Sequence, residues 1–108
     1  MEKKYIKIET FIPEEYVNKL RYELNKVGVL TTDGLYDNCM AVSKVSGSWR
    51  ALPGAQPFIG EIGSLSFQEE CKIEFSCKRE LHNEAVNTIK KFHPYEKPVI
   101  NVTALITL

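Results

Sequence analysis

The side chains best suited to chemistry gather in one short segment near the C-terminus. His93, Tyr95 and Glu96 lie within it, and an imidazole and a carboxylate are ligands for a borderline divalent cation such as copper or zinc. Cys39 is a soft ligand that would join them if the fold brings it beside His93. A metal site needs further converging ligands, which this segment does not supply.

The same residues also have a purely structural interpretation. A histidine before Pro94 avoids helical geometry, so His93 would simply end a helix. Tyr95 would then pack at an interface with its hydroxyl hydrogen-bonded, and Glu96 would face solvent. A lone cysteine such as Cys39 is most often a small buried hydrophobe.

The second candidate region is residues 46–64, which contains four glycines and two prolines. An irregular segment of this length in a small domain is usually functional or held by a partner. Trp49 could stack on a ligand, and Arg50 could pair with a phosphate or carboxylate. Alternatively, the segment packs across a neighbouring subunit with Trp49 and Phe58 as anchors. Its glycines match neither GxxxxGK[ST] nor a GxGxxG that opens a helix.

Covalent catalysis finds little support in the sequence. The serines are scattered, and none lies in a nucleophile-elbow pattern. Glu14–Glu15 and Glu69–Glu70 are adjacent pairs, and adjacent residues do not share a face of a helix or strand. We therefore expect no enzyme activity.

Composition limits the remaining function classes. A chain of 108 residues, 44% hydrophobic and 26% charged, is expected to form one globular domain over residues 1–108. Fourteen basic and fourteen acidic residues give zero net charge, which provides no general attraction for nucleic acid. No run of about 18 apolar residues predicts a membrane span, and the first residues lack a signal-peptide core.

The three cysteines indicate a reducing compartment. Their number is odd and no CxxC occurs, which argues against a disulfide framework or a zinc knuckle. Cys71 and Cys77 would lie roughly 20 Å apart along one strand, too far for a bridge. We expect three reduced thiols and a cytoplasmic protein.

Hydrophobic periodicity predicts the elements that position these residues. Alternation of apolar and polar residues is clearest at Cys71, Ile73, Phe75 and Cys77. After Pro13 the apolar residues recur at helical spacing, and this pattern ends at Gly28, a typical C-terminal cap. The predicted strands are 5–12, one long strand or a bent pair within 32–46, 71–77 and 99–108; the predicted helices are 13–27 and 79–92.

The order β, α, β, β, α, β predicts an α+β fold. Right-handed crossovers place both helices on one face of a four-stranded antiparallel sheet, which is the ferredoxin-like βαββαβ sandwich. The other face would then expose Tyr5, Phe11, Tyr36 and one side of the last strand. A monomer seldom leaves such an apolar patch in water, so we expect a subunit partner to cover it.

Two motifs carry a resemblance to a known family. Residues 34–39 read Gly-Leu-Tyr-Asp-Asn-Cys and are followed by residues 54–60, Gly-Ala-Gln-Pro-Phe-Ile-Gly. The second motif, residues 93–98, reads His-Pro-Tyr-Glu-Lys-Pro. Together they resemble the PII/CutA-like domain of YqfO-type proteins, the family of NGG-interacting factors, here as a stand-alone protein. The resemblance covers almost the whole chain, although Leu35 stands where that family has asparagine.

The resemblance implies a ferredoxin-like fold, a homotrimer, a cytosolic location and a role in ligand sensing or assembly. It also places the segment between the second and third strands where PII-like proteins bind effectors or partners. The ligand-binding residues expected on this basis are Tyr36, Cys39, Trp49, Arg50, Gln56, His93, Tyr95 and Glu96.

These observations lead to one functional prediction with two alternatives. The leading hypothesis is a non-enzymatic, trimeric PII/CutA-like module that binds a small effector or metal ion between subunits, or acts in regulation or assembly. The first alternative is a CutA-like protein that binds copper or zinc through His93, Glu96 and Cys39. The second is a small hydrolase.

Overall fold

The structure is a computed structural model that describes residues 4–106. Along the chain lie β1 (Tyr5–Ile12), α1 (Val17–Lys26), β2 (Ala41–Arg50), β3 (Leu65–Lys78), α2 (His82–Phe92) and β4 (Ile100–Leu105). Short 3-10 turns, η1 (Glu14–Tyr16) and η2 (Arg79–Leu81), precede the two helices. None of these helices is long and apolar enough to cross a membrane.

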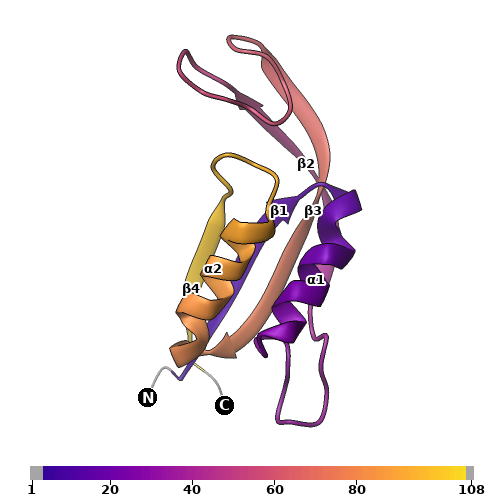
Figure 1. The fold of residues 1–108 in the computed structure, drawn as a ribbon, viewed down its shortest axis with the longest axis vertical. Coiled ribbons are helices and arrows are strands. Elements are labelled where there is room, and N and C mark those ends of the chain that lie inside the picture. Colours follow the sequence, from indigo (N-terminus) through magenta and orange to yellow (C-terminus); the bar gives the residue numbers. More distant parts are fainter. Residues whose placement is uncertain (1–3, 107–108) are drawn as a thin grey trace.

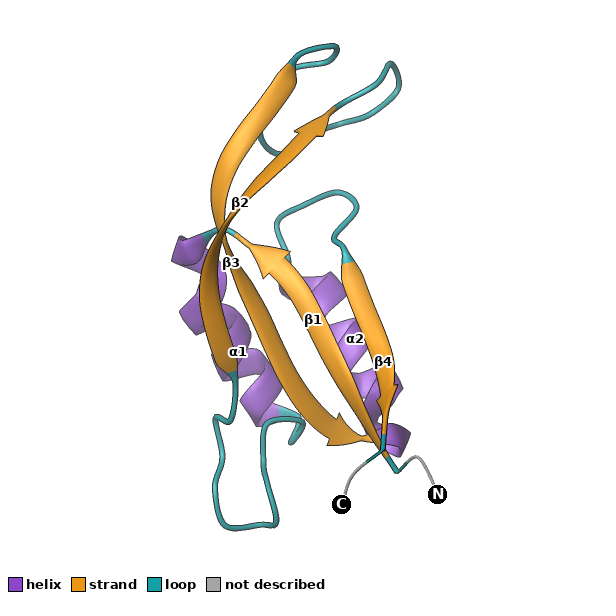
Figure 2. Cartoon of the chain, turned by 180° about the vertical axis from the view of Figure 1, so that it is seen from behind, coloured by secondary structure: helices purple, strands orange, loops and turns teal. Residues whose placement is uncertain are grey.

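The strands form one antiparallel sheet in the order β2-β3-β1-β4. Both helices pack on the same face of this sheet, and the other face is open (Figures 1 and 2). The ferredoxin-like fold predicted from the sequence is therefore confirmed.

The core forms between the helices and the sheet because two periodicities meet there. Every second residue of β1 is buried, Ile8 and Ile12 completely, and Leu20 and Leu24 of α1 fill the facing layer. The predicted alternation in β3 is also confirmed, since Cys71, Ile73, Phe75 and Cys77 all face the core. Burial of each large aliphatic side chain contributes roughly 1.5–3 kcal/mol.

The loop after α1 departs from the predicted strand. Gly28 ends the helix with a φ of +85°, as expected of a C-terminal cap, and Val29 and Leu30 return to the core. Residues 31–40 then form a loop instead of a strand, with positive φ at Asp33 and Asn38. Aspartate and asparagine tolerate this conformation better than other side chains, which explains why β2 begins only at Ala41.

The predicted irregular segment 46–64 is partly wrong, because its first residues belong to β2. Ser46 to Arg50 pair with Leu65 to Glu69 of β3, so the loop spans only residues 51–64. Since β1 pairs with β3 only from Cys71 onward, the outer part of the β2–β3 hairpin protrudes as a two-stranded ribbon (Figure 1). The Ser-Gly-Ser composition hid this strand, which depends on pairing with β3.

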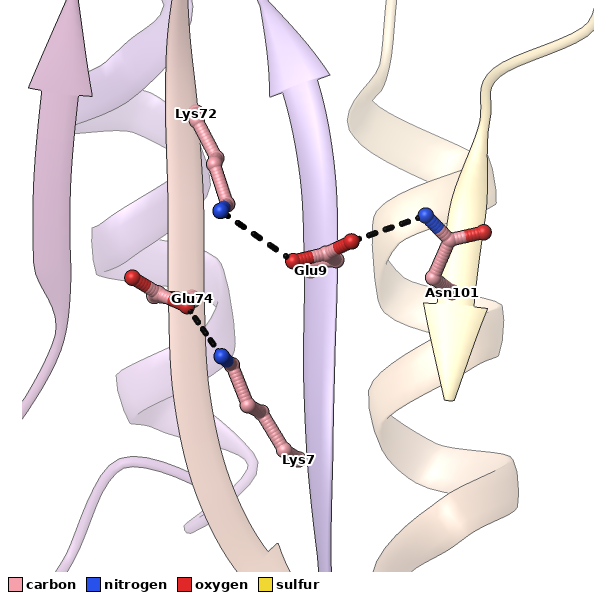
Figure 3. Close-up of polar contacts among 5 residues, drawn as sticks. All are labelled: Lys7, Glu9, Lys72, Glu74 and Asn101. Atoms are coloured by element: carbon pink, nitrogen blue, oxygen red, sulfur yellow. Dashed lines mark hydrogen bonds and ion pairs between the residues drawn. The ribbon is translucent and has the colours of Figure 1, made fainter. Parts of the chain in front are cut away.

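The open face of the sheet is also different from the prediction. Its centre is polar: Lys7 Nζ lies 2.7 Å from Glu74 Oε2, and Lys72 Nζ lies 3.5 Å from Glu9 Oε2 (Figure 3). Asn101 Nδ2 donates to Glu9 Oε1 at 2.9 Å and is the main cause of a lowered pKa at that carboxyl. The expectation of an apolar patch there is wrong, because cross-strand charges occupy it.

The three aromatic residues placed on that face by the prediction do not form a patch. Tyr5 and Phe11 are half-buried, and Tyr36 lies in the loop 31–40 rather than on the sheet. An apolar open face therefore no longer argues for a subunit partner.

Replacing Ile8 by alanine should lower the free energy of unfolding by about 2–5 kcal/mol, because it leaves a cavity in a fully buried position. The control is Val102→Ala in β4, the cross-strand neighbour of Ile8, which is 40% exposed and should lose about 1 kcal/mol or less. Urea unfolding measures both variants. Equal losses would contradict the location of the core.

Candidate functional site

A cavity with a volume of about 540 Å³ lies at the base of the β2–β3 hairpin. It lies between the protruding part of the β2–β3 hairpin, the loop 51–64 and the loop 93–99 that joins α2 to β4. The last of these loops rises toward the base of the hairpin in both views (Figures 1 and 2). The lining of the cavity combines the rings of Trp49, Phe58 and Tyr95 with the carboxylates of Glu70 and Glu96.

His93 fixes the loop 93–99 against the end of β1. Because Pro94 follows, His93 is extended (φ −83°, ψ 134°) and α2 ends there, as the sequence predicts. Its Nε2 lies 2.6 Å from the carbonyl oxygen of Phe11, and its Nδ1 accepts from the backbone N–H of Tyr95 at 3.1 Å. At the far end of the loop, the Thr10 hydroxyl donates to the Val99 carbonyl at 2.8 Å.

The protonation state of His93 follows from these partners. A carbonyl only accepts and an amide N–H only donates, so the ring is the neutral tautomer with its proton on Nε2. Burial lowers the pKa of His93, although the bond to Phe11 partly opposes this. The ring is 7% exposed and has no nitrogen left for another ligand.

Tyr95 connects this loop to the hairpin. Its hydroxyl donates to Glu70 Oε2 at 3.0 Å, and burial, followed by the hydrogen bond to Glu70, raises its pKa. The Tyr95 ring centre lies 4.8 Å from that of His93, 6.1 Å from that of Trp49 and 6.2 Å from that of Phe58. The aromatic wall of the cavity is therefore held in place by polar contacts behind it.

The loop 51–64 folds back onto the same cavity. Trp49 Nε1 donates to the Ile59 carbonyl at 3.3 Å, and the Gln56 backbone N–H donates to Glu96 Oε1 at 3.1 Å. Phe58 meets Tyr16 edge-on, with ring centres 6.1 Å apart. These contacts order the loop within a single chain.

Six of the eight predicted ligand-binding residues come together here. Trp49, Arg50, Tyr95 and Glu96 line the cavity, whereas Gln56 and His93 contact residues that line it. The other two, Tyr36 and Cys39, lie in the loop 31–40 at the opposite end of the molecule (Figure 1). Cys39 is held there by a bond from its N–H to the Leu30 carbonyl at 3.0 Å.

The residues of the predicted metal set do not fit a metal ion in this arrangement. Cys39 is remote from His93, both nitrogens of His93 are hydrogen-bonded, and Glu96 is tied to the Gln56 backbone. Among residues 4–106, no group of three or more His, Cys, Asp or Glu side chains could hold one metal ion. A copper or zinc site stays a prediction that this geometry does not support.

Glu70 is the functional candidate that the sequence analysis missed. In the sequence Glu70 stands out only as one half of the adjacent acidic pair Glu69–Glu70. Extending the alternation of Lys72 and Glu74 by one step places Glu70 on the open face of β3, beside Val45 of β2. That signal was available, but its meaning depends on the loop 93–99, which the sequence does not place.

Comparison with known proteins supports the resemblance. No family model matches the chain. The chain is 34% identical over 97 residues to proteins named GTP cyclohydrolase 1 type 2 homolog from Staphylococcus epidermidis and Staphylococcus aureus. The match covers 90% of this chain but 26% of each relative, so the chain spans about a quarter of their length.

Solved structures show the same fold. A Bacillus cereus protein related to NIF3 matches with a TM-score of 0.82 at 24% identity, covering 97% of this chain and 26% of that one. The divalent ion tolerance protein CutA1 from Ehrlichia chaffeensis matches with a TM-score of 0.70 at 20% identity, covering 100% and 87%. The resemblance to the PII/CutA-like domain of YqfO-type proteins is thus confirmed.

The expectation that the protein is not an enzyme needs correction. The curated relatives are named as homologs of an enzyme, GTP cyclohydrolase 1 type 2. The absence of a catalytic motif in the sequence therefore does not separate this chain from enzymes. Because it matches a quarter of those proteins, their name does not assign an activity to it either.

The lowered pKa of His93 predicts acid sensitivity. Below about pH 6.5 the unfolded chain binds a proton at this ring more readily than the folded chain does. The free energy of unfolding therefore decreases as the pH is lowered. A single proton accounts for a slope of at most about 1.4 kcal/mol per pH unit.

Urea unfolding at pH 7.5 and pH 5.5 measures this effect. His93→Gln should show a smaller loss on acidification than the unsubstituted protein. His82→Gln, at an exposed position of α2, should keep the full loss. An unchanged pH dependence in His93→Gln would contradict the assignment.

Proposed function

We propose that this chain is a PII/CutA-like module that binds a small organic ligand in the cavity between the hairpin and the loop 93–99, and that it works as a homotrimer. The observation that carries the proposal is the cavity itself. Its volume of about 540 Å³ falls within the range of small-molecule sites, and aromatic rings with a few polar groups are typical of their lining.

The cavity is suited to binding because its walls are already in place. Trp49 is oriented by the Ile59 carbonyl and Tyr95 by Glu70, so neither ring has to be ordered when a ligand enters. Less conformational entropy is then lost on binding. Arg50, Glu96 and Lys97 are exposed lining residues and would contact the solvent-facing part of a ligand.

The protruding hairpin supports assembly into a homotrimer. A two-stranded ribbon is marginally stable by itself in water, and here it exposes Leu65 (60%) and Phe67 (74%). The edge strands β2 and β4 each lack a second neighbour within residues 4–106. Unpaired edges and exposed apolar side chains are both satisfied when further copies pack against them. The resemblance to the PII/CutA-like domain implies that three copies assemble.

Ligand binding can be followed through Trp49, the single tryptophan of the chain. Titration with a panel of small aromatic and aliphatic compounds should give a saturable change in its fluorescence. Phe58→Ala should weaken binding by roughly tenfold, because it removes one apolar wall. Tyr36→Ala, in the loop at the opposite end, should bind normally. A panel without any saturable response would overturn the proposal.

Light scattering tests the homotrimer. The protein at micromolar concentration should have three times the mass of one chain, and Phe67→Ala should shift the population toward smaller species. Tyr22→Ala removes another exposed aromatic side chain, on α1, and should leave the mass unchanged. A stable monomer would exclude the trimer while leaving the binding experiment to decide on the ligand site.

A further inference from the structure

We infer that the ligand of this cavity carries a cationic group, an ammonium or a guanidinium, which pairs with the carboxylate of Glu70. This inference rests on the proposed function and specifies the chemical class of the ligand. The feature that carries it is a buried carboxylate in the wall of the cavity that forms no ion pair within residues 4–106.

Glu70 lies in β3 at the point where β1 ends and the sheet continues only as the β2–β3 hairpin. Its neighbour Cys71 pairs with Ile12, the last residue of β1, so Glu70 itself is paired only with Val45 of β2. The residue is 7% exposed, and it lines the cavity. The carboxylate is therefore largely shielded from bulk water by the protein and faces a partly open cavity.

The surroundings of this carboxylate leave one oxygen available. Oε2 accepts the hydroxyl of Tyr95, and within residues 4–106 Glu70 makes no other hydrogen bond and no ion pair. Oε1 lies over Gly47, where a Cβ atom would collide with it. Gly47 also lines the cavity, so the missing side chain at that position leaves the space that Oε1 occupies.

The energetics favour a positively charged partner. A buried carboxylate is costly unless it is paired, and one neutral hydroxyl uses only part of its capacity to accept hydrogen bonds. A cationic group in the cavity would supply the missing charge and donors. The faces of Trp49 and Tyr95 would add cation–π attraction to the same group. Arg50 and Lys97 are exposed, so water screens their repulsion.

A pair of probes that differ in charge tests the inference. Benzylamine, which is protonated at pH 7, and benzyl alcohol, its neutral analogue, are titrated while Trp49 fluorescence is recorded. The unsubstituted protein should bind the amine more tightly, and Glu70→Gln should weaken amine binding by about tenfold or more while leaving alcohol binding unchanged. Glu69→Gln, at an exposed position on the opposite face of β3, should behave like the unsubstituted protein.

A second variant guards against misfolding of the first. Gly47→Ala keeps the charge of Glu70 but forces the carboxylate out of its place, so it should also reduce the preference for the amine. Thermal unfolding of each variant confirms that the fold is retained.

The outcomes separate the two proposals. Equal binding of amine and alcohol, or an unchanged preference in Glu70→Gln and Gly47→Ala, would overturn the cationic ligand while the binding cavity stands. A failure of the whole compound panel would overturn both. If no amine binds and Glu70→Gln changes the molar mass, the cation is a side chain of another copy, which also overturns a small cationic ligand.

Discussion

The structure depends above all on the position of β1 between β3 and β4. One set of alternating side chains from this strand fills the core under the helices, and the other set carries the charges that pair across the open face. Its last residues also anchor the loop after α2, through the Phe11 carbonyl and the Thr10 hydroxyl. A change in the register of β1 would therefore disturb the core, the charged face and the cavity together.

The cavity forms at the point where β1 ends. Beyond Ile12 the sheet continues only as the β2–β3 hairpin, and the space that a third strand would have filled is left to the loop 93–99. Glu70 is the first residue of β3 beyond that boundary, which explains how a carboxylate in a strand becomes part of a cavity wall. Tyr95 closes the gap by binding this carboxylate from the loop.

The likeness to known proteins limits what can be carried over. The chain corresponds to a quarter of each curated relative, so the cyclohydrolase name describes proteins with much more sequence than this module. The CutA structures, by contrast, are matched over most of their length, and they share the fold at low sequence identity.

Local sequence patterns determined the elements of this protein and their order. The alternation at residues 71–77, the helical spacing after Pro13 and the glycine at position 28 each reflect an interaction between near neighbours, and all three were predicted correctly. The two motifs also identified the fold, and two of the segments singled out in the sequence, 46–64 and 93–98, do lie together around the cavity.

Only the tertiary structure decided which distant residues meet. The Ser-Gly-Ser stretch of β2 has little strand character of its own and is extended because β3 pairs with it. Cys39 was grouped with His93 on chemical type and Tyr36 through the family resemblance, yet the loop 31–40 carries both to the other end of the molecule. The burial of Glu70 likewise depends on a tyrosine 25 positions away. Spacing along a chain sets local geometry, whereas burial and charge pairing are set by the packing of elements far apart in sequence.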